Sequence, residues 1–306
     1  MTAGEWVAPA LAVLLVAAFG VTVDGWTRHV HPALGARLLL ATSALASAAL
    51  LGTLAMLALP LVGQNDALAD YARWSEAVFA RSSSSGRVVA LAAGVSLAVV
   101  IVRAAREIRG QQRATGTAES FRRAVGASRG EVVITADESL DAMALSSGVI
   151  VLTSGLVRAL DASERRAVLT HERAHVSFGH HRYRQLGRLL AALNPLLSRV
   201  PNCLDYLTER WADEEAARAT SRATTASALE RTALLSAPKP PRARTAMHAT
   251  AVAVELRVRA LRAHPPALRW SRLLTPLLIV FALMLVTLMV SERTIDVLQL
   301  AGAFGD

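Results

Sequence analysis

The stretch LTHERAHVSFGHH, residues 169–181, contains the pattern H-E-x-x-H at His171, Glu172 and His175. Residues four apart lie on one face of an α-helix, so both histidines can direct their imidazoles at one metal ion. Glu172 lies beside that pair, where its carboxylate can hold a metal-bound water. The pattern therefore predicts a catalytic zinc site, which needs three protein ligands and one open position.

The segment that carries the pattern has clear helix signals. Asp161 followed by Glu164 is typical of an N-cap with a capping box, and an apolar run begins at Ala167. No proline or glycine follows before Gly179. We therefore expect a helix over about 162–178. A helix whose His and Glu side chains only face water is the alternative, because short motifs also match by chance.

A third ligand is expected from a second helix at 205–216, DYLTERWADEEA. Glu209 and Asp213 share one face of it, so Glu209 can complete the ligand set while Asp213 accepts a hydrogen bond from a ligand histidine. An acidic surface helix is one alternative. Another makes His181 the third ligand, as in the pattern H-E-x-x-H-x-x-G-x-x-H, although Phe178 replaces the glycine whose backbone freedom that turn requires.

Composition indicates a membrane protein. Hydrophobic residues make up 53% of the 306 residues, and the mean hydropathy of +0.37 exceeds that usual for a soluble domain. Apolar segments lie at 6–23, 38–63, 88–102 and 273–290. No Lys or Arg precedes the first, which favours a retained span over a signal peptide. The third has only 15 residues and also suits a buried helix, but we expect it to span, with flanking arginines reaching the interfaces.

Charge predicts the orientation. Of the 33 basic residues, 27 lie between Arg103 and Arg272 with 16 acidic residues, which gives that region a net charge of +11. The positive-inside rule then places it in the cytoplasm. No nucleic-acid motif accompanies the arginines, so we expect attraction to anionic lipids and no direct nucleic-acid binding. The preference for arginine over lysine suggests a bacterial genome rich in G and C.

Other local patterns complete the region. Short strands are expected at 131–136, 142–146 and 149–153, the last two joined by a tight hairpin at Ser147-Gly148. Such a sheet beside the zinc helix suits the addition of an extended substrate strand. Residues 186–204, broken by Pro195 and Pro201, are interpreted as a helix at the membrane surface or capping the site. A basic, Pro-rich loop at 236–246 and a helix at 247–263 follow.

The run ALSSGVIVLTSGLVRALDASERRAVLTHERAHVSFGHH (144–181), then NPLL (194–197) and ERWADEEA (209–216), resembles the membrane metallopeptidases of the beta-lactam-sensor type, BlaR and MecR. The resemblance covers about 130–262. The chain is more distantly similar to the HtpX and CAAX prenyl protease group. Ala212 stands where the sensor family usually has cysteine. The large penicillin-binding sensor of the antibiotic receptors is not expected, because the sequence ends at Asp306.

The resemblance implies roles for particular residues. One zinc ion would be bound by His171, His175 and Glu209, with Glu172 as general base and Asp213 behind the ligands. His180 matches a histidine often found after the motif. Arg257, in ELRVRAL, matches an arginine near the site of related families. Arg257 could stabilise the transition-state oxyanion, or it could face solvent or lipid; the sequence leaves both alternatives open.

The expected fold is thus a mostly α-helical integral membrane protein with four transmembrane helices and an α+β, zincin-like metallopeptidase domain between the third and fourth. The expected units are 1–104, 105–271 and 272–306. The resemblance implies a zinc metalloendopeptidase of the bacterial cell membrane that performs regulatory proteolysis, cleaving a transcriptional repressor or itself, with 236–246 as a candidate cleavage loop. The alternatives are an HtpX-like quality-control protease and a catalytically silent signalling scaffold; the intact motif residues argue against the scaffold.

Overall fold

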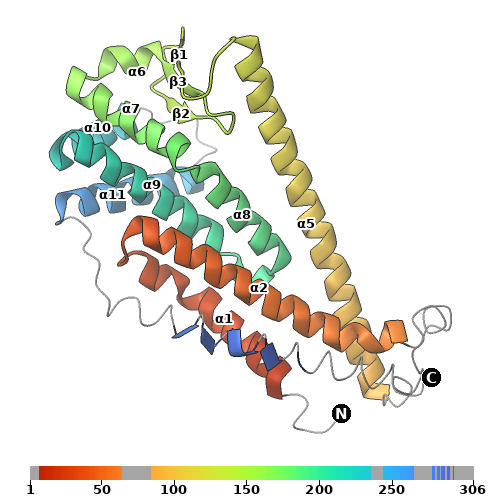
Figure 1. Cartoon of the computed structure of the whole chain (residues 1–306). Coiled ribbons are helices and arrows are strands. Elements are labelled where there is room, and N and C mark those ends of the chain that lie inside the picture. The colour runs from red at the N-terminus through yellow and green to blue at the C-terminus, as the bar shows by residue number, and fades with distance from the viewer. Residues whose placement is uncertain are drawn as a thin grey trace.

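The computed structural model describes residues 7–63, 84–235 and 244–264, together with scattered helical positions between 278 and 292. This part of the chain is mostly helical with one small sheet (Figure 1). Three of its helices are long and apolar enough to cross a membrane: α1 (Val7–Thr27), α2 (Pro32–Gly63) and α5 (Ser84–Ala124). They correspond to the first three predicted spans. The predicted fourth span, 273–290, lies largely outside the described residues.

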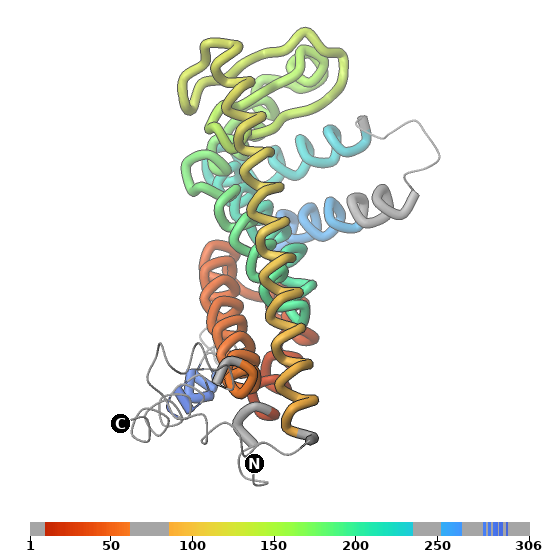
Figure 2. The backbone as a smooth tube through the Cα atoms, turned by 90° about the vertical axis from the view of Figure 1, so that its right-hand side faces the viewer, coloured from red at the N-terminus to blue at the C-terminus, as the bar shows by residue number. Residues whose placement is uncertain are grey.

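Helix α5 links the apolar part of the molecule to the predicted peptidase region. It is a single helix of 41 residues, and the boundary predicted at 104/105 falls inside it. Its first half exposes apolar side chains such as Val88 and Val95, whereas its second half carries four arginines from Arg103 to Arg113. Charged side chains on a solvated face do not interrupt a helix, so α5 continues through the point at which its sequence changes from apolar to charged. Figure 2 shows α5 running along the whole height of the molecule.

The sheet has three short strands, β1 (Val132–Thr135), β2 (Ala142–Ala144) and β3 (Ile150–Thr153), in the order β1-β3-β2. β1 pairs with β3 in parallel and β2 pairs with it antiparallel. The predicted hairpin between β2 and β3 is confirmed. Gly148 adopts a φ of 87°, a conformation that favours glycine, and its amide donates to the Leu145 carbonyl at 2.8 Å. This order leaves β2 at an edge of the sheet.

The helices after the sheet form the rest of the region: α6 (Ser154–Ala159), α7 (Ala162–Ser177), α8 (His180–Leu193), the 3-10 turn η2 (Pro195–Leu197), α9 (Val200–Ala219), α10 (Arg222–Leu235) and α11 (Arg244–Arg262). Helix α7 packs against α9 and α10, and α8 packs against α2, α5 and α9. Helices α10 and α11 pack together and project from the side of the molecule in Figure 2. The helices predicted at 162–178, 205–216 and 247–263 are confirmed, and the last two begin earlier than expected.

The two prolines that we expected to break a helix within 186–204 differ in their effect. Asn194, which precedes a proline, is extended and ends α8, as the residue before proline is disfavoured in a helix. Pro201 does not break a helix but lies in the first turn of α9, where a missing N–H leaves no helical hydrogen bond unmade. Helix α8 packs against α2, α5 and α9, and its Arg188 lines the cavity, so this segment borders the site.

A shared apolar core joins α1 and α2 to the first half of α9. Its fully buried members include Phe19 of α1, Leu39 of α2, and Leu204 and Leu207 of α9. Close approach is part of this packing, since a Cβ on Gly20 would lie 2.1 Å from the carbonyl oxygen of Leu196. Helices α1 and α2 therefore fix the position of α9.

Candidate metal centre

Helix α7 presents the H-E-x-x-H residues. Its predicted capping box is present: Asp161 Oδ1 accepts from the amides of Ser163 and Glu164 at 2.7 and 2.8 Å, and Glu164 Oε2 accepts from the Asp161 amide at 3.1 Å. Glu164 is also buried and paired with Arg231 of α10 at 2.9 Å. The start of α7 is thus fixed by its own caps and by a neighbouring helix, which sets the direction of the residues three turns later.

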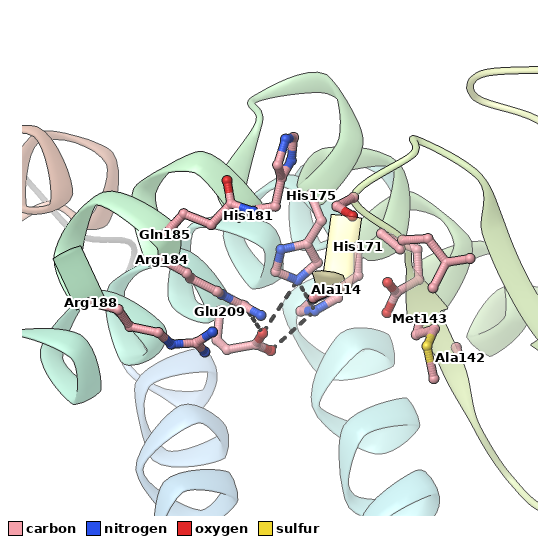
Figure 3. Close-up of a pocket in the computed structure, with 14 residues that line it drawn as sticks. Ala114, Ala142, Met143, His171, His175, His181, Arg184, Gln185, Arg188 and Glu209 are labelled. Atoms are coloured by element: carbon pink, nitrogen blue, oxygen red, sulfur yellow. Dashed lines mark hydrogen bonds and ion pairs between the residues drawn. The ribbon is translucent and has the colours of Figure 1, made fainter. Parts of the chain in front are cut away.

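The turn after α7 determines whether His181 can reach the two histidines of the motif. The left-handed residue is Gly179, with a φ of 64°, and Phe178 keeps a right-handed helical conformation. Helix α8 begins at the next residue, so His181 is carried along a new helix instead of returning to the two histidines. His181 lines the neighbouring cavity but does not join the residues whose ligand atoms converge (Figure 3). Its use as third ligand is therefore not favoured.

Helix α9 supplies the third ligand atom. Among the described residues, His171, His175 and Glu209 form a group whose ligand atoms lie within 4.8 Å of one another. The two Nε2 atoms are 3.1 Å apart. Glu209 Oε2 lies 3.3 Å from His171 Nε2, and Glu209 Oε1 lies 3.4 Å from His175 Nε2 (Figure 3). The structure thus brings together the three predicted ligands from two helices.

This donor set fits a zinc ion. Ligands about 2.0–2.2 Å from a tetrahedral zinc lie roughly 3.3–3.6 Å from one another, close to the separations seen here. Two imidazoles and one carboxylate also match the ligand set of catalytic zinc sites, which keep the fourth position open. The residues present therefore suit zinc.

Asp213 holds the first ligand histidine from behind. Its Oδ1 lies 3.1 Å from His171 Nδ1, and its side chain is 1% exposed. Burial disfavours the charged carboxylate, but the charge of Arg257 outweighs it and lowers the pKa of Asp213 to about 2. An ionised Asp213 accepts a hydrogen bond from His171 Nδ1–H, which keeps the proton on Nδ1 and leaves Nε2 free to bind a metal. The placement predicted for Asp213 is found.

His180 holds the second ligand histidine, a role that the sequence alone did not reveal. Its Nδ1 lies 2.8 Å from His175 Nδ1, and the residue is fully buried beside Trp211. Burial and the charge of His175 lower the pKa of His180 to about 3, so its ring is neutral. With Nδ1 as acceptor, His180 keeps the His175 proton on Nδ1 and leaves His175 Nε2 for the metal.

Arg257 does not face solvent. Its guanidinium binds Asp213 through Nε and Nη2 at 2.8 and 2.6 Å, and Nη1 lies 2.8 Å from Glu209 Oε2. Only 13% of the side chain is exposed, so the solvated alternative is wrong. Arg257 also does not line the cavity, which gives no support to contact with a substrate oxyanion. The geometry makes it the counter-charge for the two carboxylates of α9.

A second arginine, Arg184, binds the carboxylate of Glu209 through the oxygen that Arg257 does not contact. Arg184 Nη2 lies 2.5 Å from Glu209 Oε1, and its Nε donates to Thr208 Oγ1 at 3.2 Å. Burial would raise the pKa of Glu209, but Arg257 and the two histidines lower it well below the usual value. Glu209 is thus held ionised and in place. A sequence signal for Arg184 existed: His181, Arg184, Gln185 and Arg188 follow the spacing of one helical face.

The three predicted ligands open onto a cavity of about 380 Å³. Its walls come from β2, α5, α7, α8 and α9. The residues that line it are Ala114, Ala142, Met143, Ala144, Leu145, Ser146, His171, Glu172, His175, His181, Arg184, Gln185, Arg188 and Glu209. Glu172 is 8% exposed, lies in this lining, and is not one of the converging ligands. A base beside an open metal position, in a cleft bordered by an edge strand, is an arrangement that can hydrolyse an extended peptide.

Replacing Asp213 with asparagine should weaken zinc binding about 10–100-fold, the usual effect of losing a partner behind a metal ligand. The amide has the same size, but it removes the charge that holds His171 and Arg257. The control is Glu215→Gln on the same helix, where Glu215 pairs with Arg218 instead of the site. Competition with a chelator measures both affinities; equal zinc binding in the two variants would contradict the role given to Asp213.

Among known proteins, the sequence model of peptidase family M48 matches residues 104–275, from the second half of α5 to beyond α11. No curated protein and no solved structure matches the chain.

Proposed function

The chain belongs to peptidase family M48, a family of zinc metallopeptidases, and we propose that it is a membrane-embedded zinc metalloendopeptidase. The observation that carries the proposal is the convergence of His171, His175 and Glu209 at a cleft that Glu172 also lines. We assign one zinc ion per chain to these three ligands. Within the wider group we propose a member of the beta-lactam-sensor type, because the likeness in sequence includes the order of elements as well as the motif.

The chemistry divides between the ion and the chain. A zinc ion held by His171, His175 and Glu209 would supply Lewis-acid chemistry, polarising a carbonyl and lowering the pKa of a water. Glu172 would act as general base, taking a proton from the attacking water and returning it to the leaving amine. Asp213 and His180 keep the ligand histidines in the tautomer that leaves both Nε2 atoms free, and Arg184 and Arg257 keep Glu209 ionised. The same four residues fix the site before substrate enters, so little reorganisation is required.

The substrate backbone is expected to bind along β2. This strand pairs with β3 on one side, and Ala142, Met143 and Ala144 line the cavity. An edge strand offers unpaired N–H and C=O groups to an extended chain, which positions a peptide bond independently of its side chains. A peptide held in this way lies between β2 and α7, where Glu172 and the ligands are.

We propose a cytoplasmic position for this cleft in a bacterial cell membrane, on the basis of the +11 charge of 103–272. Helix α5 supports a site outside the hydrocarbon layer. From Val102, at the end of its apolar half, to Ala114 in the cavity lining, a helix advances about 18 Å. The substrate bond would then lie in a soluble or juxtamembrane segment of a protein and not within the bilayer.

Reporter fusions test the topology. A reporter active only in the cytoplasm should work when inserted at Pro240 and stay silent after Asp306 or at Ser84, because four spans would put the last two sites outside. Activity at both Ser84 and Pro240 would mean that only three segments cross the membrane. Immunoblotting for equal expression of each fusion is the control.

The biological role that we propose is regulatory proteolysis, in which the enzyme cleaves a transcriptional repressor or itself. The self-cleavage candidate is the loop 236–246, most of which lies outside the described residues. Comparing peptides released in cells with wild-type and Glu172→Gln protein tests this role. Fragments of one regulator or of this loop would support it, whereas fragments of many damaged membrane proteins would favour an HtpX-like quality-control protease. The absence of any difference would favour a silent scaffold.

A further inference from the structure

We propose that the cleft selects peptides carrying an acidic side chain close to the scissile bond, bound by Arg188 on the wall formed by α8. This inference rests on the proposed function, since it names the substrate class of the same site. It arises from a difference in charge between the two walls of the cavity and from the different pairing of two neighbouring arginines.

The α8 wall is polar and basic. Arg184 and Arg188 are one turn apart on α8, and both line the cavity with His181 and Gln185. Figure 3 shows both guanidinium groups on the side of the cleft where Glu209 lies. An arginine presents a planar set of donors that matches a carboxylate, so this wall has the chemistry to bind an acidic side chain.

The two arginines differ in what they already bind. Arg184 contacts Glu209 at 2.5 Å and Asp205 at 3.5 Å, so its charge is matched within the protein. Arg188 is exposed and makes no hydrogen bond or ion pair within the part of the chain that the structure describes. The charges of Arg184 and Arg188 both act on Asp205, but only Arg184 pairs with it. Arg188 is therefore the arginine of the cavity lining whose guanidinium N–H groups are available to bind a substrate.

The acids of the cavity do not offset this charge. Among the lining residues only Glu172 and Glu209 are acidic, and both are committed, one as the base and the other as a metal ligand held by two arginines. No acid of the lining is therefore left to pair with Arg188.

The opposite wall is apolar. It consists of Ala142, Met143, Ala144 and Leu145 from β2 and its turn. Met143 is 45% exposed there, which leaves its side chain available to a substrate. An apolar wall binds no carboxylate, because a charge buried without a partner is costly. A peptide along β2 can therefore place an acidic side chain only toward α8, and this gives it one preferred direction in the cleft.

A panel of peptides tests the proposal with the zinc-loaded, full-length protein in nonionic detergent free of anionic lipid. Each ten-residue peptide carries Glu, Gln or Lys at one position of a fixed, otherwise neutral sequence. At the preferred position, wild-type kcat/KM should be about tenfold higher for Glu than for Lys, which corresponds to roughly 1.4 kcal/mol. Arg188→Glu should reverse that ratio. Arg182→Glu is the matched control, an exposed arginine on the same helix outside the cavity lining, and should keep the wild-type preference.

Binding of the same panel to the zinc-loaded Glu172→Gln protein separates this inference from the proposed function. If no peptide is cleaved by the wild type but Glu peptides still bind more tightly than Lys peptides in an Arg188-dependent way, the proposed function fails and the inference stands. Cleavage without a preference for Glu, or a preference that survives Arg188→Glu, overturns the inference and leaves the peptidase function intact. A dependence on Arg188 that appears only with anionic vesicles would mean that this arginine binds lipid phosphate, and would also overturn it.

Discussion

Replacing Glu172 with glutamine is expected to abolish peptide hydrolysis while zinc remains bound. Glutamine has the same shape but accepts no proton, and general base catalysis contributes about 10²–10⁴-fold to a rate. Glu172 lines the cavity beside the converging ligands without belonging to them, so its amide should not disturb metal binding. We expect hydrolysis of a fluorogenic peptide to fall by at least 10²-fold, with one zinc per chain by elemental analysis.

The control for this experiment is Glu138→Gln, which neutralises an exposed carboxylate paired with Arg158 away from the cavity. That variant should cleave at the wild-type rate. Hydrolysis retained by Glu172→Gln would place the base elsewhere and contradict the mechanism. A variant that lost zinc together with activity would instead show that Glu172 supports the ligands.

The second large effect is expected at the third ligand. Glu209→Ala should lose most of its zinc, with an affinity loss greater than the roughly 10–100-fold typical of a residue behind a ligand. Two histidines alone leave the set incomplete, and removal of the carboxylate also exposes the site to Arg184 and Arg257, which repel a cation. Equilibrium dialysis followed by elemental analysis measures the zinc retained per chain.

His181→Ala is the matched comparison for Glu209→Ala. His181 lines the same cavity but its ligand atoms do not join the converging group, so this variant should keep its zinc. The reverse result, an empty His181→Ala protein and a loaded Glu209→Ala protein, would establish His181 as the third ligand. Glu209→Gln adds a check, since it preserves side-chain volume and should still bind zinc weakly.

Local patterns predicted the elements of this site well. The capping box at Asp161 fixed the start of α7, and the spacing of four residues placed His171 and His175 on one face and Glu209 and Asp213 on another. The hairpin at Gly148 and the first three apolar helices were also predicted, because turn conformation, periodicity and hydropathy are properties of short segments. The prediction failed at Pro201, where the sequence does not distinguish a proline that ends a helix from one that begins it.

What the sequence determined by itself was therefore the helices at 162–178, 205–216 and 247–263, and the faces of the first two that carry ligands. Which carboxylate meets the two histidines was decided by tertiary structure, because it depends on the packing of α7 against α9, and α9 is anchored in the apolar core with α1 and α2. The partners of the ligands followed from the same packing: His180 behind His175, and Arg184 and Arg257 on Glu209. Such contacts join residues on different helices, and no local spacing encodes them.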